Sequence, residues 1–198
     1  MKTVFFDVDT QLDFLYPAGA LYVPSAKEMI PALAKLTHFA VENRIQIIST
    51  ADAHTEDDPE FKIWKPHCVA GTAGQQKANA TRVAGATVLR DVSDSSAPQI
   101  IVEKQKLDAF SNPNLRPLLE AIAAERYVLY GVVTELCVRC AALGLLAMGA
   151  RVDLVRDAVK SLSATDERNF ISQFQEQGGK LTTVECVTAQ EELRQPGP

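Results

Sequence analysis

Short apolar runs alternate with longer segments of helical period along most of the chain. The apolar runs have the length of buried strands, and they cover residues 4–8, 45–49, 100–102, 127–133, 152–155 and 181–184. The segments between them have the spacing of amphipathic helices, and they cover residues 26–43, 114–124, 136–148 and 165–177. Gly149 and Gly178 follow the last two of these segments and act as helix stop signals.

This alternation is typical of a parallel sheet with helices on both faces, because each parallel strand needs a crossover to the next. We therefore predict an α/β fold: a three-layer αβα sandwich built on a doubly wound, mostly parallel sheet of about six strands. The 198 residues show no internal repeat and suffice for one hydrophobic core. We expect a single domain over residues 1–189 and a dispensable tail over residues 190–198.

Composition excludes several classes of function. The formal net charge is −5 and the pI is near 5.3, so the chain offers no basic surface to a nucleic acid backbone. No segment reaches the roughly 18 apolar residues of a membrane helix, and the acids within the first apolar run are unlike a signal peptide. The four cysteines are sparse for a secreted disulfide framework. We expect a cytoplasmic protein with reduced thiols and no membrane or nucleic acid partner.

Reactive side chains follow four of the predicted strands. They are Asp7 and Asp9 on the first, Asp52 and His54 on the second, Lys104 on the third, and Glu135 and Cys137 on the fourth. In a doubly wound fold, ligands bind beyond the carboxyl ends of the strands, so these groups converge on one rim. Each taken singly is more often a turn residue, a buried small side chain or a surface charge. Their convergence is what predicts an active site.

Cys137 is the candidate nucleophile. Residues 131–139 run from an apolar strand through a polar turn into an Ala- and Leu-rich helix, which places this thiol at a helix N-terminus. The positive end of the helix dipole and the unpaired backbone N–H groups favour a thiolate there and can also hold an oxyanion. Cys137 and Cys140 also form a Cys-x-x-Cys pattern, but without the compact thioredoxin arrangement, so we interpret Cys140 as a packing residue.

Asp7 and Asp9 allow a different interpretation. The stretch at residues 5–10 resembles the nucleophile motif of haloacid-dehalogenase-type phosphatases, in which Asp7 is the nucleophile and Asp9 the acid/base. That class also needs a later acidic pair beyond a lysine, and the adjacent pair at residues 57–58 comes too early. The pattern is weak by itself.

Five spaced motifs carry a resemblance to a known family. They are Asp-Thr-Gln-Leu-Asp-Phe at 9–14, Asp-Ala-His at 52–54, Trp-Lys-Pro-His-Cys-Val at 64–69, Lys104, and the segment 131–139. In this order, over about residues 1–185, they resemble the isochorismatase-like cysteine hydrolases, and most of all the nicotinamidase/pyrazinamidase branch. The resemblance implies a catalytic triad of Asp9, Lys104 and Cys137. It also implies a cis peptide bond between Val132 and Val133, and an oxyanion site at the N–H groups of Val133 and Cys137.

Asp52, His54 and His67 offer three ligands of the kind that suit zinc, manganese or iron. Considered without the resemblance, strand-end histidines more often make local hydrogen bonds. The resemblance implies that the three residues hold a divalent metal ion, with zinc the expected metal and manganese or iron the alternatives. In nicotinamidases the metal holds the pyridine nitrogen and orients the substrate, whereas isochorismatases proper generally lack this site.

The resemblance also implies the substrate class. Phe14 and Trp64 match ring-stacking positions, which suit a flat heteroaromatic amide. The chain departs from the nicotinamidase pattern at Leu107, where a Tyr is common, and at Leu136, where Tyr or His is common. We expect an amidohydrolase that converts a small aromatic carboxamide such as nicotinamide to the acid and ammonia through a cysteine thioester. Family members commonly self-associate, so we also expect a homo-oligomer.

Three alternatives stay open at this point. The nearest are other hydrolases of the same superfamily, which act on ureido or carbamoyl amides or, as isochorismatases, on an ether. The fold can also serve as a non-catalytic binding or oligomerisation module. The phosphatase interpretation is the third, and loss of activity on Asp7→Asn but not on Cys137→Ala would support it.

Overall fold

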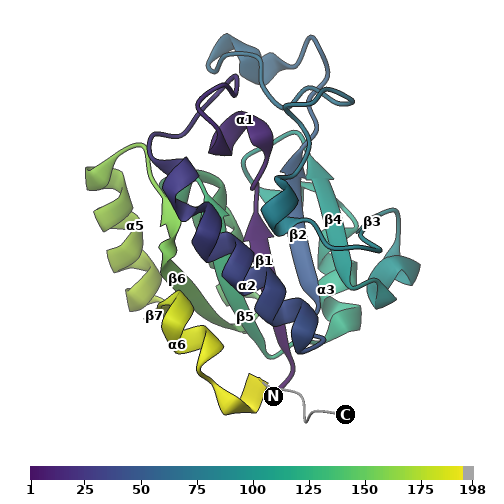
Figure 1. The fold of residues 1–198 in the computed structure, drawn as a ribbon, viewed down its shortest axis with the longest axis vertical. Coiled ribbons are helices and arrows are strands. Elements are labelled where there is room, and N and C mark those ends of the chain that lie inside the picture. Colours follow the sequence, from purple (N-terminus) through teal and green to yellow (C-terminus); the bar gives the residue numbers. More distant parts are fainter. Residues whose placement is uncertain (194–198) are drawn as a thin grey trace.

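The fold is built on a parallel sheet at the centre of the molecule (Figure 1). The computed structural model describes residues 1–193. Its strands are β1 (Thr3–Val8), β2 (Ile47–Asp52), β3 (Thr87–Val88), β4 (Gln99–Lys104), β5 (Arg126–Val132), β6 (Arg151–Lys160) and β7 (Lys180–Thr182). They lie in the order β3-β4-β2-β1-β5-β6-β7, and every neighbouring pair is parallel. The predicted fold class is confirmed, with seven strands in place of about six.

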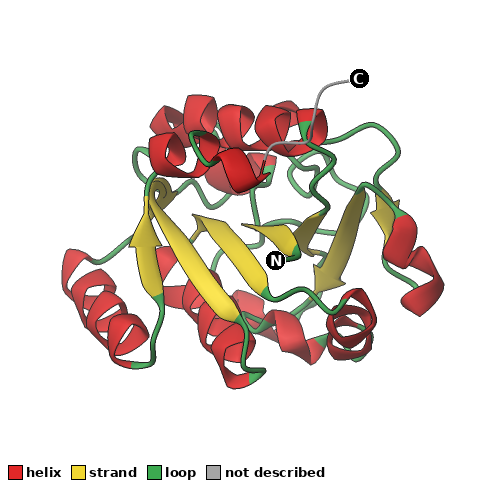
Figure 2. Cartoon of the chain, turned by 90° about the horizontal axis from the view of Figure 1, so that it is seen from below, coloured by secondary structure: helices red, strands yellow, loops and turns green. Residues whose placement is uncertain are grey.

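Helices cover both faces of the sheet and complete the three layers (Figure 2). They are α1 (Leu12–Leu15), α2 (Ile30–Glu42), α3 (Leu115–Ile122), α4 (Arg139–Ala147), α5 (Ala164–Glu176) and α6 (Val184–Thr188). Apolar residues of α2 and α6 share one core with Phe5 of β1, whereas those of α3, α4 and α5 share the other core with Phe6. Successive residues of a strand point to opposite faces, so β1 contributes to both cores.

The largest differences from the prediction concern three elements. β3 has only two residues and was not predicted, because a run this short carries no periodicity. β6 extends to Lys160, well beyond the predicted residues 152–155. The predicted strand at residues 181–184 ends earlier, at Thr182, because the Thr183 hydroxyl accepts a hydrogen bond from the Cys186 N–H at 3.2 Å and caps the N-terminus of α6.

The carboxyl end of β5 passes very close to β1. Gly131 has φ = +123°, and a side chain there would clash with the backbone of Val8. This position therefore needs glycine. The register of the β5–β6 pair also shifts between Leu129 and Gly131, just before the turn that leads to Cys137.

Residues after Ala189 pack against the amino ends of the central strands. Arg126 is 1% exposed, and it pairs with Asp153 at 2.6 Å and donates to the Gln190 side chain at 2.7 Å. Leu193 is 8% exposed and joins the core under α2 and α6. Part of the segment predicted as a tail is thus packed, and its residues 194–198 lie outside the described part of the chain.

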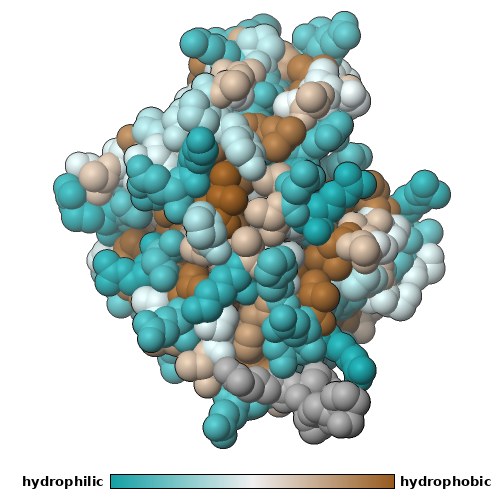
Figure 3. Space-filling view, in the orientation of Figure 1, coloured by the Kyte–Doolittle hydropathy of each residue, from teal (hydrophilic) through white to brown (hydrophobic). Residues whose placement is uncertain are grey.

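The surface of the face drawn in Figure 3 is mixed, with small hydrophobic patches separated by hydrophilic side chains. Within residues 1–193, no helix combines the length and the apolar character that a membrane crossing requires.

Candidate active site

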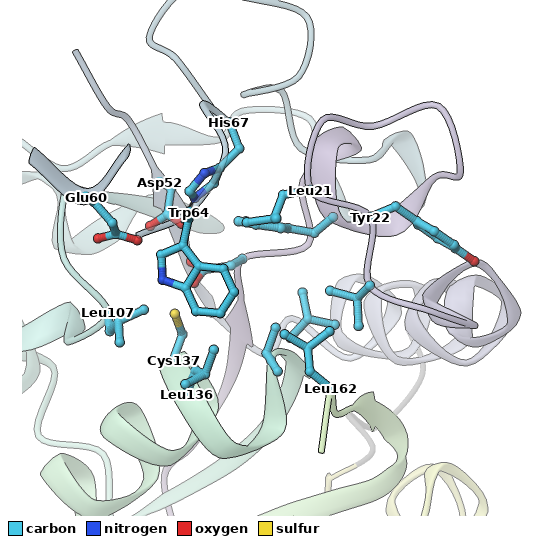
Figure 4. A pocket seen from close by; sticks show the side chains of 15 residues that line it. Leu21, Tyr22, Asp52, Glu60, Trp64, His67, Leu107, Leu136, Cys137 and Leu162 are labelled. Atoms are coloured by element: carbon cyan, nitrogen blue, oxygen red, sulfur yellow. Dashed lines mark ion pairs between the residues drawn. The ribbon is translucent and has the colours of Figure 1, made fainter. Parts of the chain in front are cut away.

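The carboxyl ends of β1, β2 and β5 meet the loops above them in one pocket (Figure 4). Asp9 follows β1, Asp52 ends β2, and Cys137 lies in the turn after β5. Cys137 belongs to a π-helical turn, Thr134–Val138, that leads directly into α4. The arrangement agrees with the rule that doubly wound folds bind ligands beyond the carboxyl ends of their strands.

Lys104, the last residue of β4, connects the acidic groups to the thiol. Its Nζ lies 2.9 Å from Oδ2 of Asp9 and 3.6 Å from Sγ of Cys137, and it also donates to Oδ1 of Asp52. The Thr50 hydroxyl donates to Oδ1 of Asp9 at 2.5 Å. All of these side chains are buried. The structure thus brings the three predicted triad residues into mutual contact.

Burial favours the protonated form of Cys137. Burial raises the pKa of the Cys137 thiol; the Lys104 ammonium opposes this, but Asp9 and Asp52 raise it further. Desolvation therefore opposes the effect of the helix terminus, which favours the thiolate. A base has to remove the proton.

Asp9 has the properties of that base. Burial raises the pKa of the Asp9 carboxyl, and the Lys104 ammonium offsets only part of this rise. Its thiol neighbour, Cys137, is within hydrogen-bonding reach. Burial would lower the pKa of Lys104, but Asp52 and Asp9 hold it well above its usual value, so Lys104 stays cationic. The cluster therefore contains a proton donor, a proton acceptor and a permanent positive charge.

Asp52, His54 and His67 form a second cluster beside the triad, with ligand atoms within 4.8 Å of one another. Oδ2 of Asp52 lies 3.8 Å from Nε2 of His54 and 3.9 Å from Nε2 of His67, distances too long for hydrogen bonds. Nδ1 of His54 is 2.9 Å from Asp58, and Nδ1 of His67 is 2.7 Å from the Lys65 carbonyl. Both rings therefore turn Nε2 toward the same space.

This cluster fits a divalent metal ion. Nε2 of His54 is buried and makes no hydrogen bond, which leaves a lone pair for a ligand. Two imidazoles and a carboxylate, with the outer ring nitrogens held by other groups, are a typical zinc environment. Asp58, which holds His54, was not singled out from the sequence.

Two residues of the first motif hold the loops of the site. The Gln11 amide donates to the Asp52 carbonyl at 2.8 Å and accepts from the Asp52 N–H at 2.7 Å. Asp13 accepts from the N–H of Cys68 at 2.7 Å and from that of Ala20 at 2.9 Å. Since Cys68 follows His67, Asp13 positions the loop that carries this ligand.

Asp7 lies outside the pocket. Its carboxylate pairs with Lys77 at 2.8 Å and accepts hydrogen bonds from Thr10 and Ser49, both at 3.1 Å. All of these groups are buried. The geometry therefore gives no support to Asp7 as a phosphatase nucleophile.

Comparison with known proteins agrees with this geometry. A family model described as the isochorismatase domain matches residues 3–186. The chain belongs to the isochorismatase family of hydrolases. The nicotinamidase of Saccharomyces cerevisiae is 22% identical over 211 residues, which cover 89% of this chain and 95% of the yeast protein.

Two crystal structures share the fold of this isochorismatase-family chain. The pyrazinamidase of Pyrococcus horikoshii in complex with zinc superposes with a TM-score of 0.80 and 28% identity, covering 92% of this chain and 99% of that one. N-carbamoylsarcosine amidase from Thermoplasma acidophilum superposes with a TM-score of 0.77 and 25% identity, covering 93% of this chain and 98% of the amidase chain. The predicted family is confirmed.

The isochorismatase-type pocket contains all four residues that were predicted to contact substrate, namely Phe14, Trp64, Leu107 and Leu136. The Phe14 ring lies 5.4 Å from that of His67. Val132 and Val133 also line the pocket, and the peptide bond between them is cis, as expected.

Sequence reasoning missed part of this pocket. The missed lining residues come from three loops, and they are Leu21, Tyr22, Val23, Glu60 and Leu162. The acidic character of residues 56–60 was a signal for Glu60. No local pattern marked the others, because only the folded loops bring them to the pocket.

Proposed function

We propose that this protein is a cysteine amidohydrolase of nicotinamidase type, which converts a small aromatic or heteroaromatic carboxamide to the carboxylic acid and ammonia. One observation carries the proposal: Asp9, Lys104 and Cys137 are in mutual contact at the floor of the pocket that Asp52 and His67 also line. A nucleophile with a base in reach and an oriented cation is the arrangement that acyl transfer needs. The similarity to a nicotinamidase and a pyrazinamidase supports the amide as substrate.

The reaction begins with proton transfer from Cys137 to Asp9. The thiolate attacks the amide carbon, and the carbonyl oxygen becomes an oxyanion that accepts hydrogen bonds from the N–H groups of Val133 and Cys137. When the carbon–nitrogen bond breaks, Asp9 returns its proton to the leaving ammonia and a thioester remains. Water then loses a proton to Asp9 and attacks the thioester, which releases the acid and restores the thiol.

Lys104 acts throughout as a fixed positive charge. Its Nζ, 3.6 Å from Sγ of Cys137, stabilises the thiolate that forms in a buried site, where an unpaired charge is costly. The same ammonium holds Asp9 at 2.9 Å and so keeps the base oriented toward the thiol.

Asp52, His54 and His67 are the residues that would hold a divalent ion, with zinc favoured by the donor set and by the zinc-bound pyrazinamidase relative. Bound there, the ion supplies a coordination position for the ring nitrogen of the substrate. Phe14 and Trp64 offer aromatic surfaces to the ring itself. Together these groups orient a flat amide with its carbonyl carbon near Cys137.

A carbamoyl amidase is the second candidate. It is favoured by the similarity to N-carbamoylsarcosine amidase and by Leu107 and Leu136, which depart from the nicotinamidase pattern. The cytoplasmic location and the homo-oligomeric state stay predictions.

Ammonia release from nicotinamide by the metal-loaded protein tests the proposal. We expect release by the native protein, none from Cys137→Ala, and near-native release from the matched variant Cys140→Ala, whose thiol lies outside the pocket lining. If the native protein releases ammonia from N-carbamoylsarcosine but not from nicotinamide, the carbamoyl amidase is the correct assignment. Release that persists in Cys137→Ala refutes the thioester mechanism.

A further inference from the structure

The pocket has two chemically different ends. Asp52, Glu60 and His67 lie at one end, where Leu107 lies below Glu60, and Leu162 lies at the other, apolar end (Figure 4). The indole of Trp64 stands between them in that view. The mechanism uses the polar end and the thiol, and it gives the apolar end no task. A substrate that fills the whole pocket therefore needs an apolar part as well as an amide.

Leu162 is the least covered part of this apolar end. It is 46% exposed, although it lines the pocket and belongs to the short loop between β6 and α5. Burying such a side chain against a ligand is favourable because it removes apolar surface from water. An apolar group bound next to Leu162 would gain this energy.

The loop that carries Leu162 is held to the nucleophile turn. Oε1 of Glu135 accepts hydrogen bonds from the N–H groups of Leu162 and Ser163, both at 2.9 Å. Glu135 is 8% exposed and lies two residues before Cys137. Leu162 therefore keeps a constant position relative to the attacking sulfur, which a residue that selects substrates requires.

The apolar end of the pocket offers no cation to an anionic substituent. Among the described residues that line the pocket there is no Lys or Arg, and the divalent ion proposed above would lie at the opposite end, beside Asp52 and His67. Lys104 lies next to the thiol but is already paired with Asp9 and Asp52. A carboxylate on the substrate near Leu162 would lose part of its hydration without gaining a partner.

We propose that the pocket selects uncharged aromatic carboxamides that carry an apolar ring substituent, and that Leu162 is the specificity-determining residue that receives this substituent. The inference rests on the proposed function and adds the substrate class to it.

Three amides that differ at one ring position test the proposal: nicotinamide, 5-methylnicotinamide and 5-carboxynicotinamide. With the metal-loaded native protein, we expect the methyl group to raise kcat/KM about fourfold, the factor that corresponds to about 0.8 kcal/mol per buried methylene. We expect the carboxylate to lower kcat/KM about tenfold, since it loses part of its hydration at the apolar end without gaining a partner.

Leu162→Arg places a cation at the apolar end and should raise kcat/KM for the carboxylate amide about tenfold relative to nicotinamide, because the new guanidinium pairs with it. The control is Ala164→Arg, which adds the same charge at an exposed position outside the pocket and should leave that ratio within about twofold, since solvent screens it. Leu162 is itself partly exposed, so neither change disturbs the core.

The outcomes separate the two proposals. If nicotinamide is hydrolysed but the methyl and carboxylate amides react as fast as each other, the inference is overturned and the proposed function stands. If Leu162→Arg and Ala164→Arg change the ratio of kcat/KM for the carboxylate amide to kcat/KM for nicotinamide equally, Leu162 is not the selecting residue. If none of the three amides releases ammonia, the proposed function itself fails, and the inference fails with it.

Discussion

Replacing Asp9 by Asn removes the carboxylate that is proposed to act as the base. Asn has nearly the same shape and can still accept the hydrogen bond that the Thr50 hydroxyl makes to Asp9 at 2.5 Å. It cannot take the thiol proton or return it to ammonia. Since a positioned acid–base group contributes about 10²–10⁴ to the rate, kcat should fall by that factor, or about 3–5 kcal/mol of activation free energy.

The same change should make the thiol more acidic. Burial is the main reason that the pKa of Cys137 lies above its usual value, and the Asp9 charge and its hydrogen bond raise the pKa further. In Asp9→Asn the burial remains, but the Lys104 ammonium, 3.6 Å from Sγ, is no longer opposed by Asp9. The thiolate fraction at a given pH therefore rises, so Cys137 should react faster with iodoacetamide while amide hydrolysis becomes slower.

Two assays on the same samples measure these effects: ammonia release, and the rate of Cys137 alkylation followed by mass spectrometry across a range of pH. Asp7→Asn is the matched control, since Asp7 pairs with Lys77 away from the pocket. Its alkylation profile and its turnover per folded molecule should stay near those of the native protein. Slower alkylation in Asp9→Asn, or turnover within about threefold of the native value, would refute the roles derived for Asp9.

The remaining predictions concern the metal and stability. Removing the metal with a chelator, or replacing His67 by Ala, should abolish amide hydrolysis while Cys137 still alkylates; turnover without bound metal contradicts the role given to this site. Burial raises the pKa of Tyr127 from 10 to about 12, so the folded protein keeps a proton that the unfolded chain loses, and this contribution is complete below pH 10 and is lost as the pH rises through 12. Near pH 11 Tyr127 should therefore contribute about 1.4 kcal/mol to the decrease in the free energy of unfolding, and Tyr127→Phe should remove that part of it in urea titrations, while Tyr130, whose pKa burial also raises, continues to contribute. Ending the chain at residue 189 removes a partner of the buried Arg126 together with the buried Leu193, and should lower the free energy of unfolding by about 3 kcal/mol. An unchanged midpoint in urea would contradict this stabilising role of residues 190–193.

Much of the fold could be predicted because local patterns and global topology agree. Central parallel strands are buried on both faces, so residues such as Phe5 and Phe6 form continuous apolar runs that are visible without any structure. The prediction was less accurate at the sheet edges. There β3 is too short for a pattern, and at residues 181–184 the cap made by Thr183 replaces the last strand residues with a helix.

The amino-acid sequence by itself determined the family and the chemical inventory of the site. The spaced motifs named Asp9, Lys104 and Cys137 through their resemblance to the isochorismatase-like hydrolases, and the strand ends of a doubly wound sheet bring such groups to one rim. His54 and His67 were identified in the same way, as residue types that bind metals.

Only the tertiary structure decided how these groups behave. The protonation of Cys137 depends on how deeply the thiol is buried and on how many carboxylates surround it, and neither can be read from its place at a helix start. The apolar end of the pocket likewise depends on long-range hydrogen bonds, such as the one that the Leu162 N–H donates to Glu135 across 27 residues of chain. Solvation and loop position are properties of the folded molecule, so no local pattern in the sequence encodes them.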